Sequence, residues 1–169
     1  MVALTQTNLA FSGVVNPGVG VMMNDAMGWS APMPGTVNSI APFARALNNM
    51  TPIVLHENGH AVMAIGGSGG RRIWPAVVQT IVNRVDFGMG LQEAVEQPRI
   101  HVESDDPVID PRFGDDVLAE LGRRGHDYSV PPKEFTLWPF SEPNGISRDG
   151  DVLKNGINPQ TKPTHAAGY

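Results

Sequence analysis

The chain has 169 residues, of which 41% are hydrophobic and 17% are charged, and its formal net charge is −5. Such a length allows one domain with a hydrophobic core, and a mildly acidic chain without a basic patch is not expected to bind nucleic acid or an anionic membrane surface. Because the chain contains no cysteine, disulfides and cysteine metal sites are excluded. No apolar run is long enough to span a membrane, so we expect a soluble protein, cytoplasmic or periplasmic, with a single domain over residues 1–169.

Strands are predicted near both ends of the chain. Residues 2–15 are rich in β-branched and apolar residues around a polar centre, which predicts a strand. Apolar runs at 53–55 and 61–65 flank Asn58-Gly59, a dipeptide that tolerates the positive φ angles of a tight hairpin turn. Asp149-Gly150 predicts a second hairpin near the C-terminus. These segments are expected to pair as antiparallel strands.

Helices are predicted between the two hairpins, where the apolar period becomes 3.6 residues. The longest is expected over 71–85, a shorter one around 91–95 before Pro98, and a third over 113–124 with Gly125 as its cap. The inward-facing residues of the third are expected to be Val117, Leu118 and Leu121. This order of strands, helices and strands predicts an α/β (α+β) layer fold with an antiparallel sheet covered by helices.

A glycine-rich stretch, IGGSGGRRIW at residues 65–74, joins the first hairpin to the longest helix. It lacks the Gly-Lys-Ser/Thr of a phosphate-binding P-loop, and Arg72 stands where a dinucleotide fingerprint needs its third glycine. A strand, a glycine turn and a helix start direct backbone N–H groups and the positive end of the helix dipole at one spot, which suits a carboxylate or an oxyanion. An ordinary strand-to-helix turn is the alternative interpretation of the same residues.

Four segments, in order along nearly the whole chain, share the pattern of one enzyme family. MVALTQTNLAFSGVVNPGVGVMMNDAM resembles a Thr-Gln-Thr strand and the loop that follows it. NNMTPIVLHENGHAVMAIGGSGGRRI resembles a Ser-Ser-Met-Ser/Thr-Pro segment, a hairpin and a Gly-Ser-Pro-Gly-Gly-Ser-Arg-Ile turn. VDFGMGLQEAVEQPRIH resembles an Asp-Tyr-Gly, Glu-Ala and Ala-Pro-Arg-Phe-His pattern, and the final Ala-Gly-Tyr resembles the family's ending. Together these segments resemble the gamma-glutamyltranspeptidase family.

The resemblance implies an N-terminal nucleophile hydrolase fold and a precursor that cleaves itself before a threonine. That threonine is the nucleophile, and its free α-amine activates it. It attacks a γ-glutamyl amide, as in glutathione, and water or an amino acid then resolves the acyl-enzyme. The chain is expected to be the small subunit, which pairs with the large subunit of the same precursor or with itself. Because Met1 resembles an internal methionine of the family, we expect the threonine strand to be missing and the isolated chain to be inactive.

The resemblance also assigns site residues. The backbone N–H groups of Gly69 and Gly70 would stabilise the oxyanion, and the hydroxyl of Thr7 would support the nucleophile. The substrate-binding positions are expected to be Asn8, Asn24, Asp25, Asn48, Asn49 and Ser68. Asn48 and Asn49 replace a serine pair of the family, and their amides can still donate hydrogen bonds to a substrate carboxylate.

One segment departs from the family in a way that bears on the substrate. Where the family has Asn-Gln-Met-Asp-Asp-Phe, the chain reads Asp25-Ala26-Met27-Gly28-Trp29, so the glutamine and the aspartate that pairs with the substrate's α-ammonium are absent. Glutathione and a non-glutamyl acyl amide, as in the acylase-like branches, therefore fit equally well. The other function class is an inactive fragment or pseudoenzyme that acts as a binding or self-association module.

No metal and no cofactor are expected. The histidines match no metal-binding spacing, and they are His56, His60, His101, His126 and His165. Asp105 and Asp106 with Asp110 are expected to form a solvated loop, because the glycine and the closing glutamate of a calcium-binding loop are absent.

Overall fold

The computed structural model describes residues 12–23, 25–45, 47–103, 105–132 and 140–159. It divides into two compact units, one ending at Asn48 and the other beginning at Asn49, and the expectation of a single domain over the whole chain stays a prediction. Within the described ranges, none of the helices has the length and apolar character of a membrane span.

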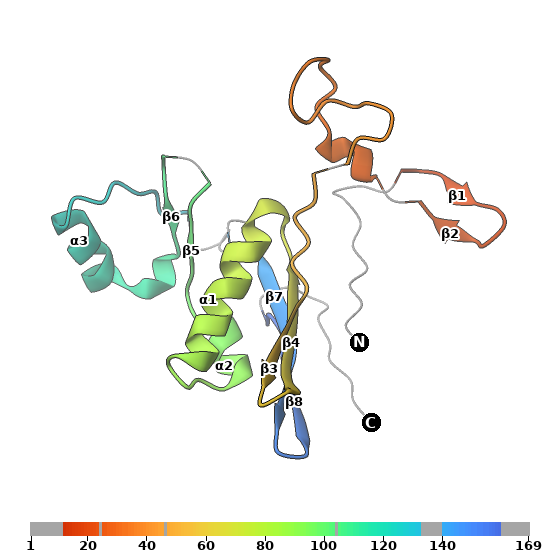
Figure 1. Cartoon of the computed structure of the whole chain (residues 1–169). Coiled ribbons are helices and arrows are strands. Elements are labelled where there is room, and N and C mark those ends of the chain that lie inside the picture. Colours follow the sequence, from red (N-terminus) through yellow and green to blue (C-terminus); the bar gives the residue numbers. More distant parts are fainter. Residues whose placement is uncertain (1–11, 24, 46, 104, 133–139, 160–169) are drawn as a thin grey trace. The chain divides into compact units, whose positions relative to one another are not determined.

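The unit that ends at Asn48 contains a two-stranded antiparallel sheet and a 3-10 helix. Strand β1 (Val15–Asn16) pairs with β2 (Val21–Met22), and η1 (Ala26–Trp29) follows (Figure 1). The turn between the strands is closed by Asn16, whose backbone carbonyl accepts from the N–H of Gly20 at 2.8 Å. The end of the predicted strand over 2–15 was expected to pair with the other predicted strands, and this expectation is corrected: Val15 pairs with Met22 across the local turn, in a separate two-stranded sheet. Residues 2–11 lie outside the described residues.

The other unit is built on a four-stranded antiparallel sheet in the order β3-β4-β7-β8. Its strands are β3 (Ile53–Glu57), β4 (His60–Ser68), β7 (Glu142–Asp149) and β8 (Val152–Gly156). Both predicted hairpins are confirmed, since β3 pairs with β4 and β7 with β8. Positive φ angles at Asn58 (50°), Gly59 (81°) and Gly150 (60°) close the two turns, as the dipeptides predict.

The predicted helices are confirmed in place. They are α1 (Ile73–Val85), α2 (Leu91–Glu96) and α3 (Asp115–Arg123), and the 3-10 helices η2 (Gly70–Arg72) and η3 (Pro111–Phe113) precede α1 and α3. A short antiparallel pair, β5 (Ile100–His101) and β6 (Val108–Ile109), was not predicted. Val117 is 44% exposed rather than inward-facing, because α3 packs mainly against η3 and lies apart from the four-stranded sheet (Figure 1).

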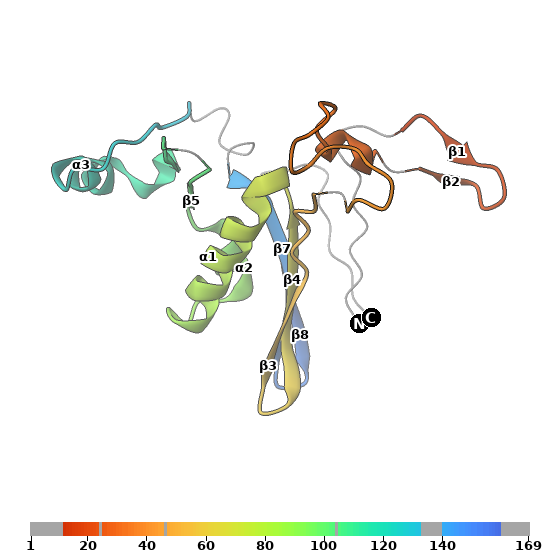
Figure 2. The same ribbon diagram turned by 45° about the horizontal axis from the view of Figure 1, so that its top comes forward.

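Helices α1 and α2 lie on one face of the four-stranded sheet (Figures 1 and 2). The core between them consists of Met63, Ile65, Ile73, Val77, Leu91 and Val95. On the opposite face, Val54, Ala64 and Ile146 stand in one row across β3, β4 and β7. Val54 is 42% exposed and Ile146 is 50% exposed, so this sheet face presents apolar side chains to its surroundings.

Candidate active site

The glycine turn lies between the end of β4 and the start of α1. Gly69 and Gly70 have φ angles of +128° and +69°, values that side chains rarely tolerate and that glycine adopts without a Cβ penalty. Gly70 opens η2, and α1 begins three residues later at Ile73. Two consecutive glycines therefore redirect the chain from a strand into a helix, as the sequence predicts.

The turn presents backbone donors that the local structure does not use. The N–H of Gly69 makes no turn or loop hydrogen bond to another described residue. Gly70 is the first residue of a helical segment, so its N–H has no carbonyl partner within that helix. Two adjacent N–H donors at the positive end of a helix form the kind of site that binds an anionic oxygen.

Ser141 forms the wall behind the turn. A Cβ placed on Gly69 would lie 2.8 Å from the Cα of Ser141 and 2.9 Å from its Cβ and Oγ. The Ser141 hydroxyl donates a hydrogen bond to the backbone carbonyl of Ser68. Ser141 is 2% exposed and has a φ of +62°, which is unusual for a residue other than glycine. The Gly69 backbone is thus packed directly against a buried serine.

Arg99 holds the segment that carries Ser141. Its side chain is 2% exposed, and it donates from Nε to the carbonyl of Phe140 (3.2 Å) and from Nη2 to the carbonyl of Ser141 (3.3 Å). Its Nη1 donates to the carbonyls of Val95 (2.6 Å) and Gln97 (3.2 Å) at the end of α2. One guanidinium therefore joins the end of α2 to the wall of the glycine turn.

The charge of Arg99 is balanced only partly by its neighbours. The pKa of Arg99 is lowered to about 10, chiefly by burial and also by repulsion from Arg112, while attraction to Asp110 opposes both effects. Because this value is well above neutral pH, the guanidinium stays charged. Asp110 is fully buried, accepts from the backbone N–H of Arg112 at 3.0 Å and forms an ion pair with the Arg112 side chain. The expectation of a solvated loop is thus wrong for Asp110, whereas Asp105 and Asp106 are exposed.

A second polar cluster links Arg71, the residue after the two glycines, through Glu103 to His101 of β5. Arg71 Nη1 donates to Glu103 Oε1 at 3.1 Å, and His101 Nε2 lies 3.3 Å from Glu103 Oε2. The hydrogen bond from His101 lowers the pKa of Glu103, and Arg71 adds to this effect. Among the residues that the structure describes, no group of three or more histidines and acidic residues is arranged to hold a metal ion.

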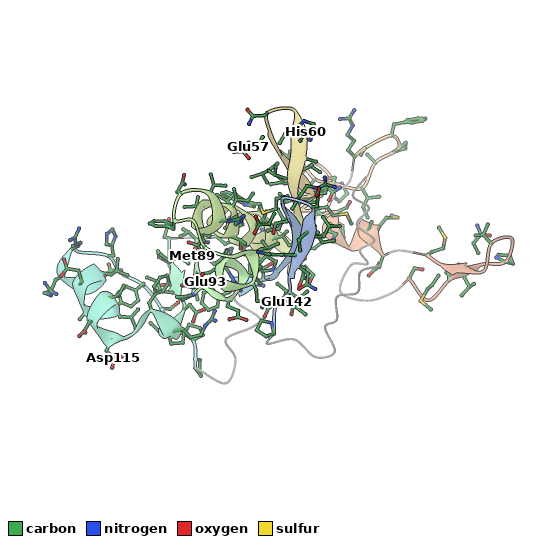
Figure 3. The ribbon with its side chains drawn as sticks, turned by 90° about the horizontal axis from the view of Figure 1, so that it is seen from below. Glu57, His60, Met89, Glu93, Asp115 and Glu142 are labelled. Atoms are coloured by element: carbon green, nitrogen blue, oxygen red, sulfur yellow. The ribbon has the colours of Figure 1, made fainter. Side chains whose placement is uncertain are left out.

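Of the predicted site residues, Ser68, Gly69 and Gly70 lie together in the turn. The exposed Ser68 hydroxyl donates to Glu142 Oε2 at 3.0 Å, and Glu142 is the first residue of β7 (Figure 3). Asn49 belongs to the same unit, and its carbonyl accepts from Thr51 Oγ1 at 3.2 Å.

Two further predicted positions, Asp25 and Asn48, belong to the other unit. Asp25 precedes η1, and Asn48 ends the other unit. Thr7, Asn8 and Asn24 lie outside the described residues.

The sequence did not single out three residues around the turn, namely Arg99, Ser141 and Glu142. Arg99 stands in the QPRIH segment, where an arginine after a proline carries no local sign of burial. Ser141 acquires its place through contacts with Ser68 and Arg99, which are 73 and 42 residues away in the sequence. Only tertiary structure joins these segments.

Comparison with known proteins identifies the pattern of the whole chain. The family model described as Gamma-glutamyltranspeptidase matches residues 1–169. The chain superposes on a solved structure, gamma-glutamyltranspeptidase from Pseudomonas nitroreducens complexed with L-DON, with a TM-score of 0.77 and 26% identity over 99% of this chain and 92% of that one. This likeness confirms the predicted N-terminal nucleophile hydrolase-like fold.

The chain matches only part of the length of two curated relatives. It is 35% identical over 128 residues to a glutathione hydrolase proenzyme of Bacillus subtilis subsp. natto, covering 73% of this chain and 21% of the relative. It is 36% identical over 135 residues to the Acylase ACY 1 proenzyme of Pseudomonas sp. (strain V22), covering 79% of this chain and 24% of the relative. The matching region thus spans between a fifth and a quarter of these relatives.

Proposed function

The chain belongs to the gamma-glutamyltranspeptidase family, and we propose that it supplies the oxyanion-binding part of an enzyme that hydrolyses or transfers γ-glutamyl or related acyl amides. The observation that carries this proposal is the Gly69–Gly70 turn, with two adjacent N–H donors and no side chain on either residue. The proposal makes these two glycines catalytic and leaves Ser68 and Asn49 as candidate substrate contacts.

The chemistry needs donors of this kind. When a nucleophile attacks an amide carbonyl, negative charge develops on the carbonyl oxygen, and fixed N–H groups stabilise that charge more in the transition state than in the substrate. Removing one such donor costs about 3 kcal/mol in acyl transfer. Backbone donors at a rigid turn suit this role because they need no reorganisation during the reaction.

The nucleophile must come from a threonine that the family places ahead of this region. Residue 1 of the chain is methionine, and the chain has no cysteine. We therefore expect the purified 169-residue chain to show no hydrolysis of γ-glutamyl-p-nitroanilide above the buffer rate. Turnover that disappears when Thr5 or Thr7 is changed to alanine would contradict this expectation, because one of these residues would then be the nucleophile.

The matched positive experiment places the chain within the proenzyme of a relative. In a chimaera, this chain replaces the homologous region of the Bacillus subtilis subsp. natto glutathione hydrolase proenzyme, with which it aligns over 128 residues. The proposal expects the folded chimaera to release p-nitroaniline from γ-glutamyl-p-nitroanilide or from its glutaryl analogue. A chimaera that folds and processes itself but turns over neither substrate would count against the proposal and favour a pseudoenzyme or binding module.

A second substrate class is favoured by the segment around η1. Ala26 and Gly28 stand where the family resemblance places a glutamine and an aspartate for the substrate's α-ammonium. Without that carboxylate, a substrate that lacks the ammonium loses little binding free energy. A γ-glutamyl substrate, in contrast, loses about 2–5 kcal/mol of binding free energy because its ammonium has no charged partner. An acylase-like preference therefore predicts that the glutaryl compound is turned over at least as well as the γ-glutamyl compound.

We also propose that the open face of the four-stranded sheet contacts the rest of the precursor. Support comes from the apolar row of Val54, Ala64 and Ile146 and from the outer edges of β3 and β8, which pair with no other strand among the residues that the structure describes. In the isolated chain, this face and these edges favour pairing between copies.

The isolated chain is therefore expected to be a dimer or a higher oligomer in sedimentation velocity. Changing Ile146 to lysine places a charge on the row and is expected to shift the distribution toward monomer, whereas the same change at the exposed Val85 of α1 is the control. A clean monomer at high concentration would contradict the expectation.

A further inference from the structure

We propose that Ser141 is a positioning residue that aims the N–H of Gly69 at the oxyanion, an inference that rests on the proposed function. The argument starts from the peptide unit between Ser68 and Gly69. Its carbonyl belongs to Ser68 and its N–H belongs to Gly69, and in a planar trans peptide these two groups point in opposite directions. Whatever fixes the carbonyl also fixes the direction of the N–H.

Ser141 fixes that carbonyl. Its hydroxyl donates to the Ser68 oxygen, and its Cα, Cβ and Oγ stand where a side chain of Gly69 would have to go. The Ser68–Gly69 peptide plane is thus held by a hydrogen bond at the Ser68 carbonyl and by packing of Ser141 against the Cα of Gly69. A hydrogen bond to the carbonyl also polarises the peptide, which makes its N–H a stronger donor.

Ser141 is held in a backbone conformation that serine rarely adopts. A serine with a φ of +62° is uncommon, and such a conformation persists only where the surroundings over-determine it. Here the surroundings are the Arg99 guanidinium, which binds the carbonyls of Phe140 and Ser141, and the burial of the Ser141 side chain. Strained residues of this kind cluster at functional sites, and this one touches the candidate oxyanion turn directly.

A purely structural serine makes a different prediction. If Ser141 only filled space, replacing it with glycine would relieve the positive φ angle, and the loss of the hydroxyl would be partly offset in stability. The dynamics of Gly69 would then stay unchanged. If Ser141 is a positioning residue, the same substitution leaves the chain folded but frees the Ser68–Gly69 peptide.

The experiment uses the ¹⁵N-labelled 169-residue chain and its Ser141→Gly and Ser141→Ala variants, with Ser147→Ala as the control at an equally buried serine of β7. We measure the amide order parameters of Gly69 and Gly70, their shifts on titration with acetate, and the thermal midpoint. In the unsubstituted chain the Gly69 order parameter is expected near 0.85, falling toward about 0.6 in both Ser141 variants. The acetate response of Gly69 should fall with it, while the thermal midpoint of Ser141→Gly stays within a few degrees.

Three results would overturn the proposal, and they distinguish its failure from a failure of the proposed function. A Gly69 amide that keeps its order parameter and its acetate response in both Ser141 variants would overturn the positioning role while leaving the proposed function in place. A lack of any acetate response in the unsubstituted chain would instead overturn the oxyanion role of the turn, and the positioning role with it. Changes at Gly69 in Ser147→Ala as large as in Ser141→Ala would also overturn the proposal, because they would show a non-specific effect.

Discussion

Replacing Arg99 with methionine is expected to lower the free energy of unfolding by about 3–5 kcal/mol. Methionine keeps much of the length and volume of the side chain but removes the positive charge and every donor. The carbonyls of Val95, Gln97, Phe140 and Ser141 then lose their partner, and a buried polar group left unsatisfied costs about 1–3 kcal/mol. Removing the buried charge also removes its desolvation cost, but this gain offsets only part of the loss, because the carbonyls remain buried without a donor.

Urea unfolding followed by circular dichroism measures this effect. Arg124→Met is the matched control, since the Arg124 side chain is 69% exposed and its pair with Glu120 is a surface ion pair, for which at most about 1 kcal/mol is expected. Arg99→Lys should fall between the two, because an ammonium keeps the charge but cannot reach the same carbonyls with a rigid planar fork. A loss for Arg99→Met no larger than that for Arg124→Met would contradict the role assigned to this guanidinium.

The elements that the sequence predicted well are those with local causes. Asn58-Gly59 and Asp149-Gly150 close their hairpins through their own backbone preferences, and the apolar period of residues 73–85 predicts the place of α1. It predicts the buried side only in part, because Ile73 and Val77 are buried whereas the other apolar residues of the period include four exposed ones, namely Trp74, Val78, Val82 and Val85. The glycine turn was predicted for the same reason, because its geometry follows from residues adjacent in the chain. Local propensity and tertiary structure agree at these places.

Other features of the structure were not predicted from the sequence, and only some of them depend on long-range contacts. Asp110 was expected in solvent because an aspartate near other aspartates is usually solvated, yet the backbone of η3 and the Arg112 side chain pay for its burial with hydrogen bonds. The strand over 2–15 was expected to join the main sheet; its described end instead pairs with β2 across a turn four residues long, and residues 2–11 lie outside the described residues. The wall formed by Arg99 and Ser141 has no local signal at all.

Gly69→Ala is expected to lower the free energy of unfolding by about 3 kcal/mol, through two separate causes. The positive φ angle of +128° is strained for any residue with a side chain, at a cost of about 1–2 kcal/mol, and the new methyl would stand 2.8 Å from the Cα of Ser141. That neighbour is backbone and cannot rotate away, so the turn itself must move, at a further cost of about 1–3 kcal/mol.

Gly88→Ala separates the two causes of the Gly69→Ala effect, because Gly88 also has a positive φ (+68°) but has no atom within 4 Å of the new Cβ. It is expected to lose only the strain term, about 1–2 kcal/mol in urea unfolding. Because moving the turn displaces the N–H donors of Gly69 and Gly70, Gly69→Ala should also reduce turnover by the chimaeric proenzyme about 10²–10³-fold, while Gly88→Ala leaves it near the unsubstituted rate. Equal losses of stability and activity in the two variants would show that Ser141 does not constrain the turn. The proposal that Arg99, by holding Ser141, positions the N–H of Gly69 for the oxyanion would then be wrong.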